Sequence, residues 1–413
     1  MATSKITNLS VADTIISGQT ALGAAPADTD EFLVSDAGTL KRVDYSYIKG
    51  ITQASFLPNV EPLIINGNMS VAQRGTSATS ISSVNGYYTC DRMAMEINGL
   101  GTWTQTQEAL TTGDAFADGF KNAIKLDCTT ADASPAAGDS LSLVYKFESQ
   151  DLQVLKKGTA NAEKMTLSFW VKSTKTGTFI AEFYDHDNTR QISTAYTVSV
   201  SDTWEKKVIN IAADTTGALA NDNGAGIYIY MWLGAGSTYT SGTLSTTWTT
   251  PVNGDRAAGQ VNIADNTSNN FHLTGLQLEV GEYTAATLPP FKFSSYGDNL
   301  LRCQRYYENS YRLGHYPGDS VVDGGSYSGF LYSTDFLVSF FPFKVNKRDN
   351  PTMTFYDRNG TAGKWYGGVY QVSEAIDNIV VSLNTTTGWM GTISSVAANT
   401  NEGHGYYVAD AEL

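Results

Sequence analysis

Cysteine, long apolar runs and positive charge are all scarce in this chain of 413 residues. The three cysteines, Cys90, Cys128 and Cys303, are too few and too scattered for a disulfide framework or a structural zinc site, so we expect reduced, packed thiols. No run approaches the roughly 18 apolar residues of a membrane-spanning helix, and the opening MATSKITNLSVADT lacks the apolar core of a signal peptide. The sequence therefore predicts neither membrane insertion nor signal-peptide export.

The charge balance excludes a further class of partner. Lysine and arginine number 27 against 41 aspartates and glutamates, which gives a formal net charge of −14. A basic footprint for nucleic acid is therefore missing, and anionic membranes would repel the chain. We expect a neutral partner, or one bound through local polar groups.

Common catalytic signatures are also missing from the sequence. It contains no GxSxG, HExxH or P-loop pattern, and no short regular repeats of the kind that build a parallel β-helix. The carboxylate pairs Glu279 with Glu282, or Asp185 with Asp187, satisfy the residue types of a glycosidase, but so do many other pairs. The sequence therefore predicts a protein without catalytic activity.

What the chain has in quantity is Gly, Thr, Ser, Tyr and Phe, which favours an all-β protein with many turns. Two segments alternate strictly, KMTLSFWVKS and GIYIYMWLG, with aliphatic side chains at every second position and aromatic or polar ones between them. TFIAEFYDH and TWEKKVINI add two more strands, and no long helix separates them. We therefore predict a β-sandwich from about Asn66 to Phe293 in which both sheet faces are covered.

The segment from Asn270 to Glu308 should connect this sandwich to the C-terminal part of the chain. Its apolar positions change parity at Gly275, which predicts a bulge that ends the sandwich, and Pro289 and Pro290 then predict extended chain. The next residues predict a short helix capped by Ser295, with Leu300, Cys303 and Tyr307 on one face.

Two further modules flank the sandwich in the sequence. TDEFLVSDAGTLKRVDYS predicts a hairpin turned at Asp36-Ala37-Gly38, which is marginal alone and needs copies from other chains or a docking partner. The alternative for this region is a leader without fixed structure. Residues 309 to 413 are again rich in β patterns, as in DFLVSFFPFKV, PTMTFYD, NIVVSLN and HGYYVADAEL, and predict a smaller distal β-sandwich.

Several phrases occur in the order found in one protein family. They are ALGAAPADTDEFLVSDAGTLKRVDYS, INGNMSVAQRGTS, GYYTCDRM, LTGLQLEVG, SYG followed by CQRYYE, and the terminal ADAEL. The chain resembles bacteriophage tail-fibre proteins, receptor-binding fibres that have a jelly-roll, carbohydrate-binding-module-like domain. The family usually has Trp after DR, where Met93 stands here, so a sugar-stacking role at that position is in doubt.

The resemblance implies a domain order and a function. Residues 1–61 would be a virion-attachment or shaft module, 62–293 the jelly roll, 294–308 a linker helix and 309–413 the distal β domain. The chain would form a homotrimer with helix contacts through Leu300, Leu301 and Tyr307. It would be assembled in the host cytoplasm into the virion, bind a phage tail or capsid protein through its N-terminal segment, and bind host-surface glycan without catalysis. A capsid-decorating fibre and a polysaccharide depolymerase tailspike stay open as alternatives.

Aromatic residues supply the candidate glycan contacts, because sugars lie flat on aromatic rings while their hydroxyls need polar neighbours. One row consists of Trp170, Tyr228, Tyr230 and Trp232; its alternative role is packing. A distal set, which we prefer because a distal domain would meet the cell first, consists of Trp365, Tyr366, Tyr370, Trp389, Tyr406 and Tyr407. For this set the alternative is a domain core or a trimer axis.

A metal site has little support in the sequence. The oxygens of Asp185-His186-Asp187-Asn188 are possible calcium ligands at a turn, but no EF-hand spacing accompanies them, and a solvated turn is favoured. The histidines His272, His315 and His404 stand apart from any metal-binding pattern. We therefore expect no metal and no cofactor.

Overall fold

The structure is a computed structural model, which describes residues 26–48, 61–321, 327–333, 336–337, 340–367, 374–377, 379–393 and 402–413. The chain forms two units, a small one around the N-terminal hairpin and a large one that begins at Glu61, and each is described by itself. Almost all regular structure is antiparallel β-sheet, which confirms the all-β prediction. No helix in the described ranges is both long and apolar enough to cross a bilayer.

The small unit contains the predicted hairpin. Strands β1 (Glu31–Asp36) and β2 (Thr39–Asp44) pair in full register, from Glu31 opposite Asp44 to Asp36 opposite Thr39. Ala37 and Gly38 have φ of 49° and 82°, so they form the two-residue turn with positive φ that fits the twist of a hairpin. The apolar residues Phe32, Leu33 and Val34 stay exposed, so the hairpin buries little within its own unit.

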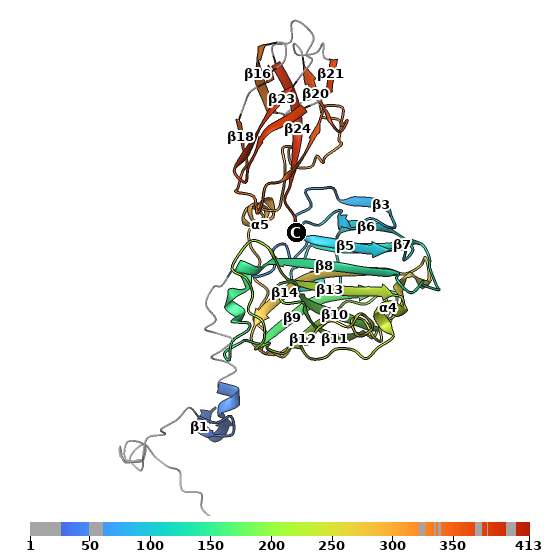
Figure 1. Ribbon diagram of the computed structural model, residues 1–413. Helices are drawn as coiled ribbons and strands as arrows, with labels where there is room; N and C mark the ends of the chain where they lie inside the picture. Colours follow the sequence, from blue (N-terminus) through green and yellow to red (C-terminus); the bar gives the residue numbers. More distant parts are fainter. Residues whose placement is uncertain are drawn as a thin grey trace, which may run out of the picture. The chain divides into compact units, whose positions relative to one another are not determined.

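The large unit begins with a sandwich of two six-stranded sheets (Figure 1). One sheet has the order β11-β10-β13-β8-β5-β4, and its strands are β4 (Gly86–Tyr87), β5 (Met93–Asn98), β8 (Ser140–Glu148), β10 (Gly177–Asp185), β11 (Arg190–Val198) and β13 (Ala225–Ala235). The other has the order β12-β9-β14-β7-β6-β3, from β3 (Ser77–Ile81), β6 (Thr102–Ala109), β7 (Asn122–Thr130), β9 (Met165–Ser173), β12 (Glu205–Ile211) and β14 (Asn270–Val280). Because the chain passes repeatedly from one sheet to the other, the arrangement is that of a jelly roll.

The connections of the sandwich include only short helical pieces. These are α3 (Asp114–Ala117), α4 (Ser237–Thr240) and the 3₁₀ turns η1 (Ser149–Leu155), η2 (Asn253–Asp255) and η3 (Ile263–Asp265). None is long enough to serve as a crossover helix between parallel strands. The described part of the sandwich therefore contains no βαβ units.

The alternation in the sequence places the core between the two sheets. In β13 the aliphatic residues Ile227, Ile229, Met231 and Leu233 face the other sheet and join one large cluster with Leu167, Phe169 and Val171 of β9. Cys90, Cys128 and Met93 are also in this cluster, and all three cysteines are free and buried, as predicted. Met93 therefore occupies a core position.

Strand β14 contains the predicted irregularity. Its register against β9 shifts between Thr274 and Gln277, and Gly275 between them has φ of 62°. The ring of Phe120 lies 2.7 Å from where a Cβ of residue 275 would be, so this backbone and this contact both require glycine. The prediction that the bulge ends the sandwich is wrong, because the strand pairs with β9 again as far as Val280.

Helix α5 (Tyr296–Gln304) follows the sandwich and is capped as predicted. The Ser295 hydroxyl accepts a hydrogen bond from the backbone N–H of Asp298 at 3.1 Å. Cys303 packs into a small cluster with Ile65, Val71 and Tyr306. The helix ends before Tyr307, which begins strand β15 (Tyr307–Asn309), so the predicted seven-residue helical spacing does not apply to it.

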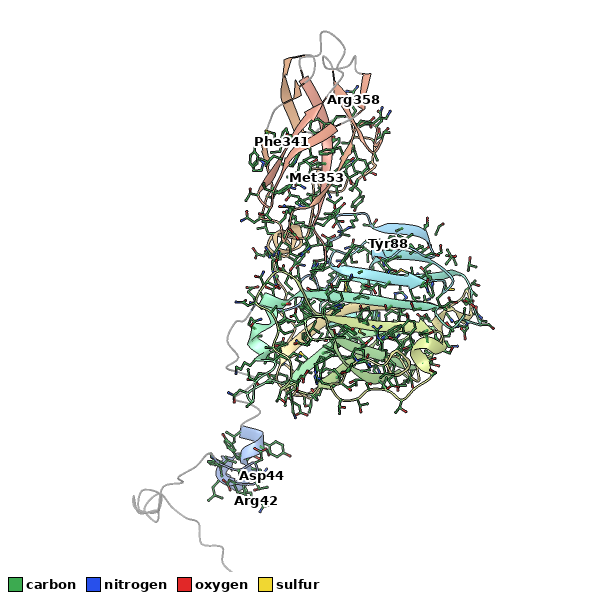
Figure 2. All side chains as sticks on the ribbon, viewed as in Figure 1. Arg42, Asp44, Tyr88, Phe341, Met353 and Arg358 are labelled. Atoms are coloured by element: carbon green, nitrogen blue, oxygen red, sulfur yellow. The ribbon has the colours of Figure 1, made fainter. Side chains whose placement is uncertain are left out.

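The distal β domain is built around β24 (Glu402–Asp410), which pairs with β15, β16 (Tyr327–Ser333), β19 (Thr352–Tyr356) and β20 (Lys364–Gly367). The short strands β17 (Phe336–Leu337) and β21 (Glu374–Asp377) extend this sheet, and β18 (Phe340–Pro342), β23 (Gly388–Ile393) and β22 (Ile379–Asn384) form a second one. Phe341 and Met353 lie among these strands (Figure 2), where Phe341 is buried and Met353 packs against the same core. The predicted β structure of this region is confirmed where the structure describes it.

Candidate functional site

The outer face of the sheet that contains β14 has a polar row beside an apolar cluster that includes Phe120 and Trp170. Register pairs place Thr106 of β6, Lys125 of β7, His272 of β14 and Lys172 of β9 in one row, each opposite the next. These residues alternate with the core residues of the same strands, so their side chains point away from the core. A row of hydroxyl, ammonium and imidazole groups is suited to binding a ligand with many hydroxyls.

A cleft of about 420 Å³ lies at one end of this row. It is formed where β6 runs into the 110–114 segment and where the loop before β12 approaches the end of β9. Its lining is mostly polar and consists of Glu108, Ala109, Leu110, Thr111, Thr112, Gly113, Asp114, Lys172, Asp202, Thr203 and Trp204. The cleft thus has one aromatic wall among carboxylate, hydroxyl and ammonium groups.

Trp204 is held in place as that wall; its side chain is packed into a buried cluster and is 8% exposed, so only a small part of the ring borders the cleft. Its Cδ1 lies 2.8 Å from where a Cβ of Gly113 would be, and its ring meets the His272 ring edge-on with the ring centres 5.9 Å apart. The Lys172 ammonium lies 5.8 Å from the centre of the indole. Glycine at position 113, where φ is 92°, is what lets the loop close onto the ring.

His272 links the polar row to the cleft. Its Nδ1 lies 2.8 Å from Glu108 Oε2 and its Nε2 lies 3.2 Å from Asn270 Oδ1, while the imidazole itself is buried. Burial lowers the pKa of His272, although the Glu108 carboxylate opposes that shift. The hydrogen bond to His272 lowers the pKa of Glu108, and Lys125 and Lys172 add to the effect.

These shifts predict a loss of stability in acid. Because the pKa of His272 in the folded chain is lower than its ordinary value of about 6.5, the unfolded chain binds a proton there more readily, so the free energy of unfolding falls as the pH drops through that value. The contribution of Glu108 is lost in the same direction at lower pH. Urea unfolding at pH 7 and pH 5.5 should show a smaller decrease in midpoint for His272→Gln than for the natural chain.

Titratable groups other than His272 and Glu108 do not affect the comparison between the natural chain and His272→Gln. Burial raises the pKa of Asp91 to about 6, which contributes in the opposite direction, but it does so in both chains and cancels. Equal pH slopes in the two chains would show that His272 does not carry the effect.

The predicted aromatic row is divided between the two sheets. Trp170 lies on the same outer face as the cleft, opposite Thr274, and its indole N–H donates to Asp118 Oδ2 at 3.2 Å. It packs beside a cluster that includes Phe120 and is partly exposed. Trp170 therefore stays a candidate contact next to the cleft.

Tyr230 and Trp232 lie on the outer face of the other sheet, together with Tyr228, and are buried there. The indole N–H of Trp232 donates to Glu182 at 2.9 Å, and Arg256 sits 5.3 to 5.4 Å from the ring centres of Tyr230 and Trp232. Arg256 also pairs with Glu182, so it fixes its own loop over these rings. Their prediction as glycan contacts is wrong, because the loop covers them.

The preferred distal set is also internal where the structure describes it. Trp365 and Trp389 are 0% and 1% exposed and form the core of the distal domain with Phe341 and Phe355. Their prediction as the glycan surface is wrong, because a ligand has no access to either ring. Tyr406 and Tyr407 are buried too, while the Tyr366 side chain and all of Tyr370 lie outside the described residues.

The three predicted trimer contacts differ in how far they are buried within their own chain. Tyr307 is buried within its own chain, with the Arg74 guanidinium 3.6 Å from its ring centre, so its prediction as an intersubunit residue is wrong. Leu300 packs in part against the Cys303 cluster. Leu301 is 48% exposed and stays a prediction.

The turn at Asp185-His186-Asp187-Asn188, considered above for calcium, contributes to a buried ion pair. Asp185 is buried and pairs with the Lys157 ammonium at 2.6 Å, and that ammonium also pairs with Asp214 at 2.9 Å. The favoured solvated turn is therefore wrong for Asp185. Among the described residues, no three His, Cys, Asp or Glu side chains gather as a metal-binding group.

Sequence reasoning missed the cleft. The sequence places Lys172 and Trp204 in predicted strands without a role in binding. It assigns no role to Glu108 or Asp202. The one available signal was the polar parity of KMTLSFWVKS, which places Lys172 on an outer face.

Comparison with known proteins gave no match to any protein-family model and none to a curated protein. The similar solved structures include the enzymatically active domain of tailspike protein 4 of bacteriophage CBA120, with 10% identity over 53% of this chain and 21% of that one (TM-score 0.27). They also include a cyclase from Fischerella sp. (10% identity, 54% and 98%, TM-score 0.30) and a family 11 carbohydrate-binding module of Clostridium thermocellum in complex with a β-1,3-1,4-mixed-linked tetrasaccharide (8% identity, 50% and 96%, TM-score 0.24). At these TM-scores the likenesses carry no argument about function.

Proposed function

We propose that this chain binds a glycan through the cleft beside Trp204 and does not act on it chemically. The observation that best supports this proposal is the composition of the cleft. Its lining combines one indole ring with hydroxyl, carboxylate and ammonium groups on the outer face of a sheet. Sugars need such a combination, because their C–H faces stack on a ring while their hydroxyls exchange hydrogen bonds with polar neighbours.

The setting that we propose is a bacteriophage virion. The resemblance of the sequence phrases to tail-fibre proteins supports a receptor-binding fibre that attaches through residues 1–61 and binds host-surface glycan during adsorption. The exposed apolar residues of the hairpin support a homotrimer, since copies of the hairpin would cover them. Virion cryo-electron microscopy would show whether the N-terminal segment docks on the tail or on the capsid.

Trp204→Ala tests the cleft directly. We expect it to weaken retention of the protein by host-surface polysaccharide in affinity electrophoresis at least tenfold, about 1.4 kcal/mol, because the aromatic ring that borders the cleft is removed. Asp202→Asn changes an exposed lining group and should also weaken binding without affecting the core. Tyr296→Ala, which removes an exposed tyrosine outside the cleft, is the matched control.

Two results would reject the proposal. Folded Trp204→Ala and Asp202→Asn proteins that bind as tightly as the natural chain would exclude the cleft as the glycan site. Release of shortened polysaccharide chains during the incubation would reject the non-enzymatic part and favour a depolymerase.

A further inference from the structure

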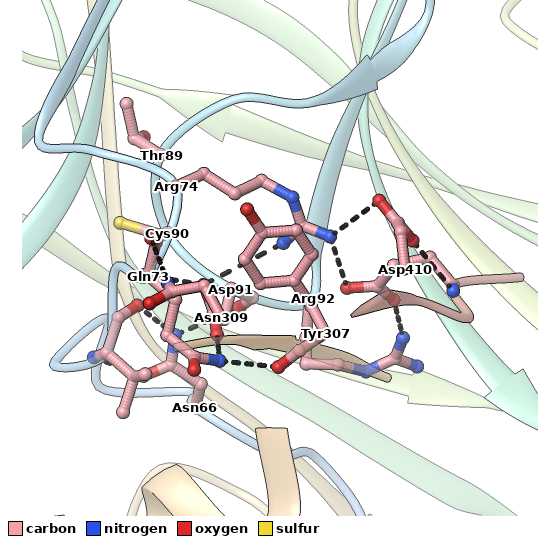
Figure 3. A network of polar contacts seen from close by, with 12 residues as sticks. Asn66, Gln73, Arg74, Thr89, Cys90, Asp91, Arg92, Tyr307, Asn309 and Asp410 are labelled. Carbon is pink, nitrogen blue, oxygen red and sulfur yellow. Dashed lines mark hydrogen bonds and ion pairs between the residues drawn. The ribbon is translucent and has the colours of Figure 1, made fainter. Parts of the chain in front are cut away.

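The sequence phrases that resemble the phage family converge on one buried polar network (Figure 3). The phrase INGNMSVAQRG supplies Asn66, Gln73 and Arg74, and YYTCDRM supplies Asp91 and Arg92. Gln73 Nε2 donates to the Tyr307 carbonyl at 2.8 Å, and Asn309 Nδ2 donates to the Gln73 carbonyl at 2.9 Å. These residues therefore join the sandwich to β15 of the distal domain.

Asp410 and Glu412 complete this network. Arg74 Nη2 lies 3.3 Å from Asp410 Oδ2 and 3.3 Å from Glu412 Oε1, and Arg92 Nη1 pairs with the other oxygen of Glu412. The side chains of Arg74, Arg92 and Glu412 are 9%, 1% and 5% exposed. Their charges are thus removed from water together.

The backbone of the same segment is also bound. Arg348 donates to the carbonyl of Ala411 at 2.8 Å and to that of Glu412 at 3.2 Å, and Lys146 Nζ donates to the carbonyl of Leu413 at 3.2 Å. The Leu413 side chain packs against the aromatic cluster on the outer face of β13. Residues 410–413, here called the tail, are therefore held by the charges of Asp410 and Glu412, by backbone hydrogen bonds and by the apolar Leu413 side chain.

Without the tail, Arg74 and Arg92 would lose the carboxylates of Asp410 and Glu412, which offset the cost of burying their charges. Arg92 would keep only the Lys146 carbonyl, at 2.5 Å, and the faces of Tyr306 and Tyr145. Arg74 would keep Asp91 at 3.8 Å and the face of Tyr307. A buried cation without a full partner is costly, so this surface should select an acidic segment.

We propose that the sandwich has a binding site for an acidic peptide of the type Asp-Ala-Glu-Leu, formed chiefly by Arg74, Arg92 and Lys146, and that the chain's own tail occupies it. Since the tail continues directly from β24, the central strand of the distal domain, its binding fastens that domain to the sandwich. This site is separate from the glycan cleft and does not depend on it.

A chain shortened to end at Asp410 tests the proposal, because it keeps every residue of β24 and vacates the part of the site that binds Ala411, Glu412 and Leu413. Fluorescence anisotropy would follow a labelled peptide, Ala-Glu-Leu, which matches the three vacated positions. We expect the peptide to bind the shortened chain at least tenfold more tightly than the full chain, whose site is filled. A peptide with Gln in place of Glu, and a shortened chain with Arg92→Gln, should both abolish the binding.

A second variant keeps the full length. Glu412→Gln removes the charge that both arginines share, so the peptide should bind this chain at least tenfold more tightly than the natural one, and trypsin should cleave between the sandwich and the distal domain faster. Equal peptide binding by the full chain, the shortened chain and Glu412→Gln would overturn the proposal, and so would equal binding of the neutral peptide.

Discussion

Trp389→Ala is expected to lower the free energy of unfolding of the distal domain by about 3–5 kcal/mol while leaving glycan binding by the sandwich unchanged. The Trp389 ring is 1% exposed and lies 4.6 Å from the Phe341 ring and 4.9 Å from that of Phe355, measured between centres. Truncation removes the apolar transfer energy and leaves a cavity between rigid rings that cannot collapse into it. Hydrogen exchange of the peptides from β22 and β23, measured by mass spectrometry, would localise the loss.

Phe340→Ala is the matched control for that prediction. Phe340 is the neighbour of Phe341 on β18 but is 49% exposed, so its truncation should have a much smaller effect on the same peptides. A Trp389→Ala protein that kept its protection from exchange but lost glycan retention would show that the ring contacts ligand, in contradiction to its burial.

The sandwich was predictable because its strands have a strong period of two. In β13, alternation correctly assigned Ile229 and Met231 to one face and Tyr230 and Trp232 to the other. Alternation does not say what covers a face. The outer face of β13 is covered by a loop that brings Arg256 over the rings, whereas the outer face of β9 stays partly open at Trp170.

The cleft could not be predicted for a related reason. Its walls come from the 110–114 and 202–204 segments, which are far apart in sequence and meet only because β9 and β6 belong to one sheet. The distal aromatics were misjudged because a small β core and a binding surface use the same residues, Tyr and Trp among glycines. Composition gives the residue type, and only packing decides whether a ring such as that of Trp365 is inside.

Lys347→Met should destabilise the distal domain by a comparable amount, about 3–5 kcal/mol, because it leaves a buried carboxylate without its cation. Lys347 and Glu308 form an ion pair in which neither side chain is exposed. Glu308 also accepts hydrogen bonds from the Tyr407 hydroxyl at 2.9 Å and from the backbone N–H of Lys344. Burial lowers the pKa of Lys347, and the Glu308 charge opposes that shift.

The double variant Glu308→Gln with Lys347→Met separates the cost of an orphaned charge from the net contribution of the pair. Gln can still accept from Tyr407 and from the Lys344 backbone, and no unpaired charge is left, so this chain should recover at least half of the lost stability in urea unfolding. If the double variant were as unstable as Lys347→Met alone, the loss would come from packing around the lysine stem and its hydrogen bond to the Gln304 carbonyl. Recovery would instead show that this junction between α5, β15 and β24 tolerates polar burial only when its charges are matched, as at Arg92 and Glu412.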